Sequence, residues 1–207
     1  DDRFLVTAGN NSLLGGNGAD FYSLSSGNET VIESNADDAG NDTISTGSGG
    51  DWAEGALGAD SLHNTGGNDT LLGGDGDDRF LVTTGNNSLL GGNGTDSVSG
   101  GNGNDTIFES EDDDAANDTL AGNAGSDSIF GAQGDDSLYS SNGGDDTLIG
   151  GAGNDSLTQG GGTNTTNNDS MLGGDGDDRI DGGGGHNTLI GGNGTDSVLG
   201  AGGNDSI

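Results

Sequence analysis

Residues 91–108 read GGNGTDSVSGGNGNDTIF, which is one nine-residue pattern written twice without a break. Each copy has two glycines, a third glycine after one spacer, an aspartate and then an apolar residue two positions later. This pattern, GGxGxDxUx with U a large apolar residue, occurs in full seven times. A sustained short period predicts a repeat architecture. The full copies begin at Gly15, Gly73, Gly91, Gly100, Gly150, Gly173 and Gly191.

Degenerate copies fill the gaps between the full ones, so the aspartate position, called the register position below, can be followed from Asp2 to Asp205. Its 22 occurrences are nine residues apart except at four steps, where extra residues enter before Asp42, Asp118, Asp146 and Asp169. Insertions in a repeat array usually form surface loops. We therefore expect a single continuous array over residues 1–207.

Two further positions of the unit are constrained. The residue two places after every register position is apolar, from Phe4 to Ile207, and we expect these 22 side chains to form the buried core. The residue two places before it is glycine except at Ala116 and Asn167. Glycine suits a backbone turn that other residues resist. Each unit thus predicts a turn followed by a short strand.

The composition requires a counter-ion. The chain has 36 acidic residues against three Arg and no Lys, a formal charge of -33, and only 26% hydrophobic residues. Such a chain is too polar and too self-repelling to collapse unaided. Asp and Asn oxygens with free carbonyls are the hard ligands that Ca²⁺ selects. Nucleic acid is excluded as a partner because it is also an anion.

The absence of cysteine excludes both disulfides and thiolate metal sites. Burial of one apolar side chain per nine residues falls well short of the conformational entropy lost on folding. Metal binding would then supply folding free energy. We expect a chain that is disordered in chelator and folds in millimolar calcium.

A longer repeat overlies the short one. Residues 1–20 read DDRFLVTAGNNSLLGGNGAD and residues 77–96 read DDRFLVTTGNNSLLGGNGTD, so the array grew by duplication of blocks. A weaker third copy begins at Asp177. The chain also starts and stops inside a repeat, so we expect it to be a fragment of a longer protein.

The nonapeptide resembles the RTX (repeats-in-toxin, haemolysin-type) calcium-binding family, and the resemblance covers essentially the whole chain. It implies an all-β, right-handed parallel β-roll, or β-solenoid, in which two nonapeptides complete one coil. It also implies calcium ions stacked in the Gly-rich turns, held by register aspartates of successive turns and by turn carbonyls. The implied carbonyl ligands lie at Gly16, Gly18, Gly74, Gly76, Gly92, Gly94, Gly101, Gly103, Gly151, Gly153, Gly174, Gly176, Gly192 and Gly194.

If that geometry holds, alternate register positions lie on opposite edges. One edge is Asp throughout, whereas the other contains every exception, so we expect one complete calcium ladder and one with weaker rungs. The first edge holds Asp2, Asp20, Asp42, Asp60, Asp78, Asp96, Asp118, Asp136, Asp155, Asp178 and Asp196. The second holds Asn11, Glu29, Asp51, Asp69, Asn87, Asp105, Asp127, Asp146, Asp169, Asn187 and Asp205.

Some features have competing interpretations. The acidic insertions around residues 33–38 and 109–114 are interpreted as exposed loops in preference to extra calcium sites. Phe21 and Trp52, directly after register positions, are predicted to point outward. Ice binding through the Ser and Thr residues at that position is disfavoured because Arg3, Phe21, Trp52, Arg79 and Arg179 interrupt the row.

The sequence therefore predicts a calcium-binding extracellular structural protein, such as a surface layer, sheath, fibre or adhesin stalk, and no enzyme. Ends without polar capping units suggest copies stacked end to end into filaments. The alternative is the calcium-dependent secretion and folding module of an exoenzyme or toxin. Either implies export, as the family resemblance suggests, by a bacterial type I pathway. No apolar run is long enough for membrane insertion.

Overall fold

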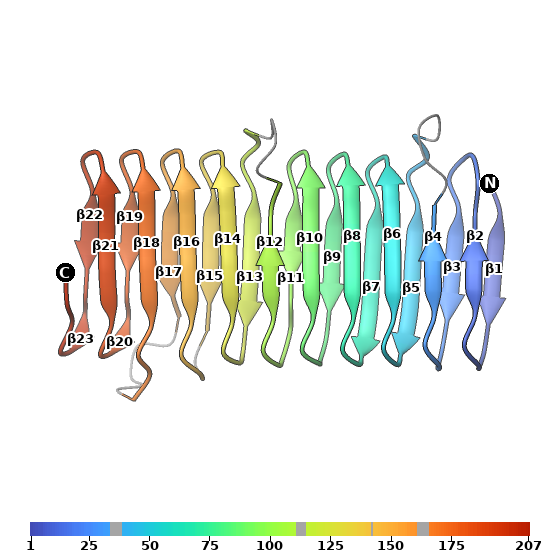
Figure 1. Cartoon of the computed structure of the whole chain (residues 1–207), viewed down its shortest axis with the longest axis horizontal. Coiled ribbons are helices and arrows are strands. Elements are labelled where there is room, and N and C mark those ends of the chain that lie inside the picture. The colour runs from blue at the N-terminus through green and yellow to red at the C-terminus, as the bar shows by residue number, and fades with distance from the viewer. Residues whose placement is uncertain (34–38, 111–114, 142, 161–165) are drawn as a thin grey trace.

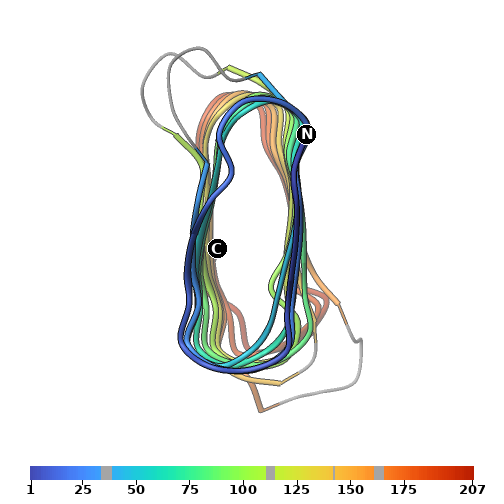
Figure 2. The same cartoon turned by 90° about the vertical axis from the view of Figure 1, so that its right-hand side faces the viewer.

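The computed structural model describes residues 1–33, 39–110, 115–141, 143–160 and 166–207. Successive strands alternate between two parallel sheets, so the chain winds into a long, flattened coil (Figures 1 and 2). The described residues contain no helix, and hence none that could span a membrane. The predicted all-β parallel solenoid is confirmed.

One sheet has 11 strands and the other has 10, and a short pair lies beside them near the C-terminal end. The 11-stranded sheet contains β1 (Arg3–Val6), β3 (Phe21–Leu24), β5 (Thr43–Ser48), β7 (Ser61–Gly66), β9 (Arg79–Val82), β11 (Ser97–Ser99), β13 (Thr119–Asn123), β15 (Ser137–Ser140), β17 (Ser156–Gln159), β19 (Arg179–Asp181) and β22 (Ser197–Leu199). The 10-stranded sheet contains β2 (Ser12–Leu14), β4 (Thr30–Ile32), β6 (Trp52–Leu57), β8 (Thr70–Asp75), β10 (Ser88–Asn93), β12 (Thr106–Phe108), β14 (Ser128–Gln133), β16 (Thr147–Ala152), β18 (Ser170–Asp175) and β21 (Thr188–Asn193). The pair is β20 (Gly184–Gly185) with β23 (Gly202–Gly203).

The strand register matches two nonapeptides per coil. Leu71 pairs with Leu89 in the 10-stranded sheet, and Leu62 pairs with Phe80 in the other. Register residues that precede the 11-stranded sheet form the first edge, from Asp2 to Asp196, at the top of Figure 1. Those that precede the 10-stranded sheet form the second edge, from Asn11 to Asp205. The division of the register positions between two edges is therefore confirmed.

The core is a column of side chains between the two sheets. Strand side chains alternate in and out, as in β9, where Phe80 and Val82 are buried and their neighbours are exposed. Most of the predicted apolar positions are buried, and Phe4, Leu13 and Val198 pack partly against them. The prediction is wrong for Ile207, which is 77% exposed because no strand lies on it in the described part of the chain.

The outer face of the 10-stranded sheet carries an apolar row. Its members lie side by side through the strand register, and Glu54 is the single polar residue among them. Leu14, Phe108 and Ile190 are 61%, 38% and 52% exposed, and the others are partly exposed. The apolar row comprises Leu14, Ile32, Leu72, Leu90, Phe108, Phe130, Ile149, Leu172 and Ile190.

The residues that follow the register positions point outward, as predicted for Phe21 and Trp52. Phe21 is 37% exposed, Trp52 is partly exposed, and the Arg3 guanidinium lies 5.1 Å from the Phe21 ring centroid. The Ser and Thr residues that follow the register positions form two rows, one on each sheet, and not the single row expected. The three arginines and Phe21 interrupt the row on the 11-stranded sheet, and only Trp52 interrupts the row on the described strands of the other.

Candidate metal ladders at the two edges

A hydrogen-bonded ladder joins the register residues along each edge. On the first edge the backbone N–H of Asp60 donates to Oδ1 of Asp78 at 2.7 Å, and that of Asp78 donates to Oδ1 of Asp96 at 2.7 Å. The same bond joins all neighbours from Asp2 to Asp196. On the second edge it continues from Glu29 to Asp205. One carboxylate oxygen is thereby used to hold the next coil in place.

The second oxygen of most first-edge carboxylates points into the turn. A Cβ atom built on Gly73 would lie 2.2 Å from Asp78 Oδ2 and 2.5 Å from the Gly91 carbonyl oxygen. Asp78 is 2% exposed, and its Oδ2 has no hydrogen-bond partner among the described residues. A carboxylate oxygen and a carbonyl oxygen therefore lie on the same side of Gly73 within the turn, and both are oxygen donors of the kind that Ca²⁺ selects.

The same arrangement recurs along the first edge. A Cβ atom on Gly150 would lie 2.2 Å from Asp155 Oδ2 and 2.7 Å from the Gly173 carbonyl oxygen. One on Gly173 would lie 2.2 Å from Asp178 Oδ2 and 2.6 Å from the Gly191 carbonyl oxygen. An orphaned, buried carboxylate oxygen beside a carbonyl oxygen is the donor set that a hard cation fits.

Glycine at these turns allows close stacking of the coils. Gly74 has φ +115°, and a Cβ atom there would lie 2.0 Å from the Ala56 carbonyl oxygen of the preceding coil. A side chain would therefore be strained and would also collide with backbone. All fourteen glycines predicted as carbonyl ligands have positive φ. Their turns are placed as the sequence predicted, and their roles as ligands remain a proposal.

Burial without a cation strongly disfavours the charged carboxylates. It raises the pKa of Asp78 to about 8, with Asp60 and Asp96 adding repulsion. Burial also raises the pKa of Asp155 to about 6 and raises that of Asp178. A bound cation would reverse this effect, because an opposite charge favours the ionised form.

The second edge differs at the residue two places after each core residue, where the strand enters the turn; we call this the entry position. On the first edge every entry residue is glycine except Glu33 and Glu109. On the second edge only Gly100, Gly122, Gly182 and Gly200 are glycine. The remaining second-edge entry residues are Val6, Leu24, Thr46, Asn64, Val82, Ser140 and Gln159.

Several of these entry side chains bind the carboxylate oxygens that face the turn. Asn64 Nδ2 donates to Asp51 Oδ2 at 3.2 Å, and Ser140 Oγ donates to Asp146 Oδ2 at 2.9 Å. Gln159 Nε2 donates to both Asp146 Oδ2 and Asp169 Oδ2, each at 3.2 Å. Protein donors thus occupy part of the second edge, whereas Asp69 Oδ2 and Asp105 Oδ2 there are buried without a hydrogen-bond partner among the described residues.

Substituted register residues also alter the second edge. Asn87 Nδ2 donates to Asp105 Oδ1 at 2.8 Å, and Asn187 Nδ2 donates to the Gly182 carbonyl oxygen at 2.8 Å. Asn11 Nδ2 lies 3.4 Å from Glu29 Oε1. The amides therefore act partly as donors, which suits a cation less than a carboxylate does.

The structure corrects one prediction at the insertions. Glu33 and Glu109 are only 2% and 5% exposed, so they do not belong to exposed acidic loops. They enter the turns as core-directed side chains at the entry position. The rest of both insertions, residues 34–38 and 111–114, lies outside the described residues. The sequence signal was available, since these are the two departures from glycine on the first edge.

The comparisons with known proteins agree with this geometry. The chain matches the family described as RTX calcium-binding nonapeptide repeat (4 copies) over residues 1–31, 37–71, 72–107, 112–143, 140–166 and 172–207. A search of curated proteins gave no match.

Proposed function

Because the chain belongs to the RTX calcium-binding nonapeptide repeat family, we propose that its first edge is a calcium ladder which drives folding. The register aspartates from Asp2 to Asp196 supply carboxylate oxygens, and the turn glycines supply carbonyl oxygens. The observation that carries this assignment is the buried Oδ2 of Asp78, which has no hydrogen-bond partner and faces the Gly91 carbonyl. The repeat is a structural calcium-binding fold, and in this proposal it is not an enzyme.

The second edge holds fewer or weaker calcium ions in this proposal. Asn64, Ser140 and Gln159 already donate hydrogen bonds to the carboxylates there. An ion would have to displace those donors as well as bind. The weaker ladder predicted from Asn11, Glu29, Asn87 and Asn187 therefore has an additional cause in the entry side chains.

Folding and calcium binding are coupled by the charge of the edges. Closing the coils stacks register carboxylates on one another, and the resulting burial penalises their charged forms. Calcium offsets that penalty only when successive turns are stacked, because its ligands come from different coils. Binding free energy then becomes folding free energy.

We further propose that the module is a structural element of a secreted surface protein and associates with copies of itself. The apolar row supports self-association, since its members run along the sheet with one interruption at Glu54, and Leu14, Phe108 and Ile190 are exposed. An extended exposed apolar surface favours contact with another macromolecule. A layer, fibre or stalk uses such contacts between long, rigid units.

The test is a calcium titration of chelator-stripped protein, followed by far-UV circular dichroism with light scattering recorded in parallel. We expect a cooperative change from coil to β structure, accompanied by rising scattering. A chain already β-rich without calcium, at neutral pH, would contradict calcium-driven folding. Folding with flat scattering would contradict self-association.

That last outcome would favour the second candidate, a calcium-dependent folding module that accompanies a type I-secreted exoenzyme or toxin. The coupling of folding to calcium supports it equally, because such a chain stays unfolded at low cytosolic calcium and folds after export. A catalytic domain encoded beside the repeat would distinguish this role from a structural one.

A further inference from the structure

Two glutamates replace glycine at the entry position of the first edge. Glu33 follows β4 and Glu109 follows β12, and both precede insertions in the array. They are 76 residues apart, which is also the spacing of the duplicated blocks at Asp1 and Asp77. Both side chains are buried. Hydrogen bonds from Tyr22 and the Gly16 backbone favour the charged form of Glu33, but the nearby Asp20 and Asp42 carboxylates oppose it.

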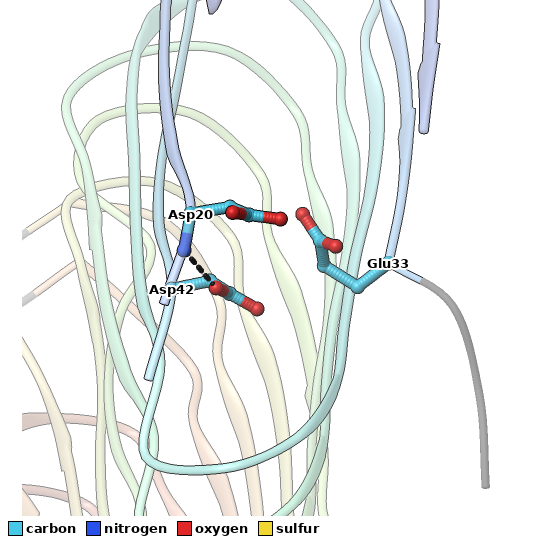
Figure 3. A group of neighbouring side chains, drawn as sticks. All are labelled: Asp20, Glu33 and Asp42. Atoms are coloured by element: carbon cyan, nitrogen blue, oxygen red, sulfur yellow. Dashed lines mark hydrogen bonds between the residues drawn. The ribbon is translucent and has the colours of Figure 1, made fainter. Parts of the chain in front are cut away.

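The first glutamate completes a cluster of three carboxylates. Asp20, Glu33 and Asp42 each offer an oxygen such that these atoms lie within 4.8 Å of one another. Figure 3 shows Glu33 reaching from the opposite strand toward the two aspartates. The three residues are 3%, 2% and 2% exposed. Asp20 Oδ2 is buried and has no hydrogen-bond partner among the described residues.

The glutamate oxygen replaces the carbonyl oxygen of a regular turn. A Cβ atom on Gly15 would lie 2.3 Å from Asp20 Oδ2 and 2.3 Å from Glu33 Oε2. At Gly73 the equivalent point lies between Asp78 Oδ2 and the carbonyl oxygen of Gly91. Glu33 thus takes the place in space that a turn glycine carbonyl takes elsewhere.

The duplicated block repeats the arrangement in part, since among the described residues only the oxygens of Asp20, Glu33 and Asp42 all lie within 4.8 Å of one another. A Cβ atom on Gly91 would lie 2.4 Å from Asp96 Oδ2, and 2.2 and 2.6 Å from Glu109 Oε2 and Oε1. Glu109 Oε2 also accepts a hydrogen bond from the Gly92 N–H at 3.1 Å. The Asp96 N–H donates a hydrogen bond to Oδ1 of Asp118, the next register residue. The Asp20 N–H donates to Asp42 Oδ1 in the same way.

We propose that Glu33 and Glu109 are calcium ligands, which complete two sites of three carboxylates where insertions interrupt the regular turns. The sites contain Asp20, Glu33 and Asp42, and Asp96, Glu109 and Asp118. This inference rests on the proposed calcium ladder. Affinity for calcium rises with the number of charged ligands. These two sites therefore fill before the regular ones, which have a carbonyl in place of the third carboxylate.

The decisive measurement counts bound ⁴⁵Ca²⁺ by equilibrium dialysis in the parent chain and in the double variant Glu33→Gln, Glu109→Gln. The parent is expected to show two tight sites ahead of a weaker phase. The double variant loses the tight phase, with dissociation constants raised at least about tenfold. Glu54→Gln, which removes the same charge from a partly exposed position on β6, is the matched control and leaves the count unchanged.

The outcomes separate the two proposals. An unchanged tight phase in the double variant, with the weaker phase intact, overturns the assignment of the glutamates but leaves the ladder standing. No calcium binding by the parent overturns both. Circular dichroism at saturating calcium shows whether each variant folds.

A second readout reports on one site alone. A Cβ atom on Gly15 would lie 2.2 Å from the Tyr22 hydroxyl oxygen, so an aromatic group lies beside the first site, whereas the second copy has Val98 there. In a background with Trp52→Phe and Tyr139→Phe, which leaves Tyr22 as the one Trp or Tyr residue, Tb³⁺ emission should be lost in Glu33→Gln and kept in Glu109→Gln. Equal emission from both variants would overturn the assignment of Glu33.

Discussion

The backbone N–H of Asp60 donates a 2.7 Å hydrogen bond to Oδ1 of Asp78, the register aspartate one coil later. The other oxygen of Asp78 is buried and faces the carbonyl of Gly91. Asp78 therefore has two roles in the proposed ladder, because one oxygen aligns the coils and the other is left for a cation. Substitutions can separate these roles.

Asp78→Asn keeps an oxygen that can accept the Asp60 N–H but removes the charge on the calcium-facing side. We expect the calcium concentration at the folding midpoint to rise at least about tenfold, measured by circular dichroism. Asp77→Asn is the matched control, because Asp77 is exposed and its Oδ1 accepts the Thr95 N–H at 2.9 Å. Equal midpoints for the two variants would rule out Asp78 as a ligand.

Gly73→Ala places a methyl group between Asp78 Oδ2 and the Gly91 carbonyl oxygen. Because φ at Gly73 lies outside the left-handed region, the main effect is to obstruct the site. We expect one fewer calcium ion per chain by equilibrium dialysis. Gly50→Ala is the control, since its Cβ atom would meet nothing closer than 3.5 Å. A full complement of ions in Gly73→Ala would show that Asp78 Oδ2 and the Gly91 carbonyl oxygen do not share a calcium ion.

Substitution by Asn should have different effects on calcium binding at neighbouring register residues of the two edges. Asp155 Oδ2 has no hydrogen-bond partner among the described residues, whereas Asp146 Oδ2 accepts bonds from Ser140 and Gln159. We expect Asp155→Asn to weaken calcium binding. Asp146→Asn should keep the ion count and lower the unfolding free energy by about 1–3 kcal/mol through lost hydrogen bonds. Dialysis and thermal unfolding at saturating calcium measure the two effects, and a reversed pattern would contradict the assigned edges.

The calcium-free chain should gain β structure as the pH falls. Burial raises the pKa of Asp78 to about 8, of Asp146 to about 7 and of Asp155 to about 6. The folded state therefore binds protons that the unfolded state releases, since an unperturbed Asp has a pKa of about 3.9. The resulting stability is lost as the pH rises through the folded-state pKa values.

Circular dichroism of the calcium-free chain from pH 8 down to pH 5, above the sequence pI of about 4.1, measures this gain. In calcium the dependence reverses, because protons compete with calcium for the same oxygens. The midpoint calcium concentration should then rise as the pH falls. More β structure at pH 8 than at pH 5 in calcium-free buffer would contradict the buried ladder.

Much of the fold could be predicted from one period. Leu62, Leu71 and Phe80 each lie two residues after an aspartate, and all three are buried as predicted. The period of nine predicted one turn and one short strand per unit, and the resemblance to the RTX family supplied the two units per coil. Ile207 lies at a core position of the unit but is exposed, because burial also requires a neighbouring coil that covers the side chain.

The sequence by itself determined the repeat, its core positions and its register positions, because a strict repeat makes every local choice agree with the same global arrangement. The resemblance to the RTX family added the two units per coil, and hence the two edges. Only the tertiary structure decided what each edge can bind. Asn64 and Gln159 meet the carboxylates of the second edge, and Glu33 meets Asp20 and Asp42, through contacts between different turns. Such contacts depend on where a side chain points after the coils have stacked, and that direction is not encoded in the spacing.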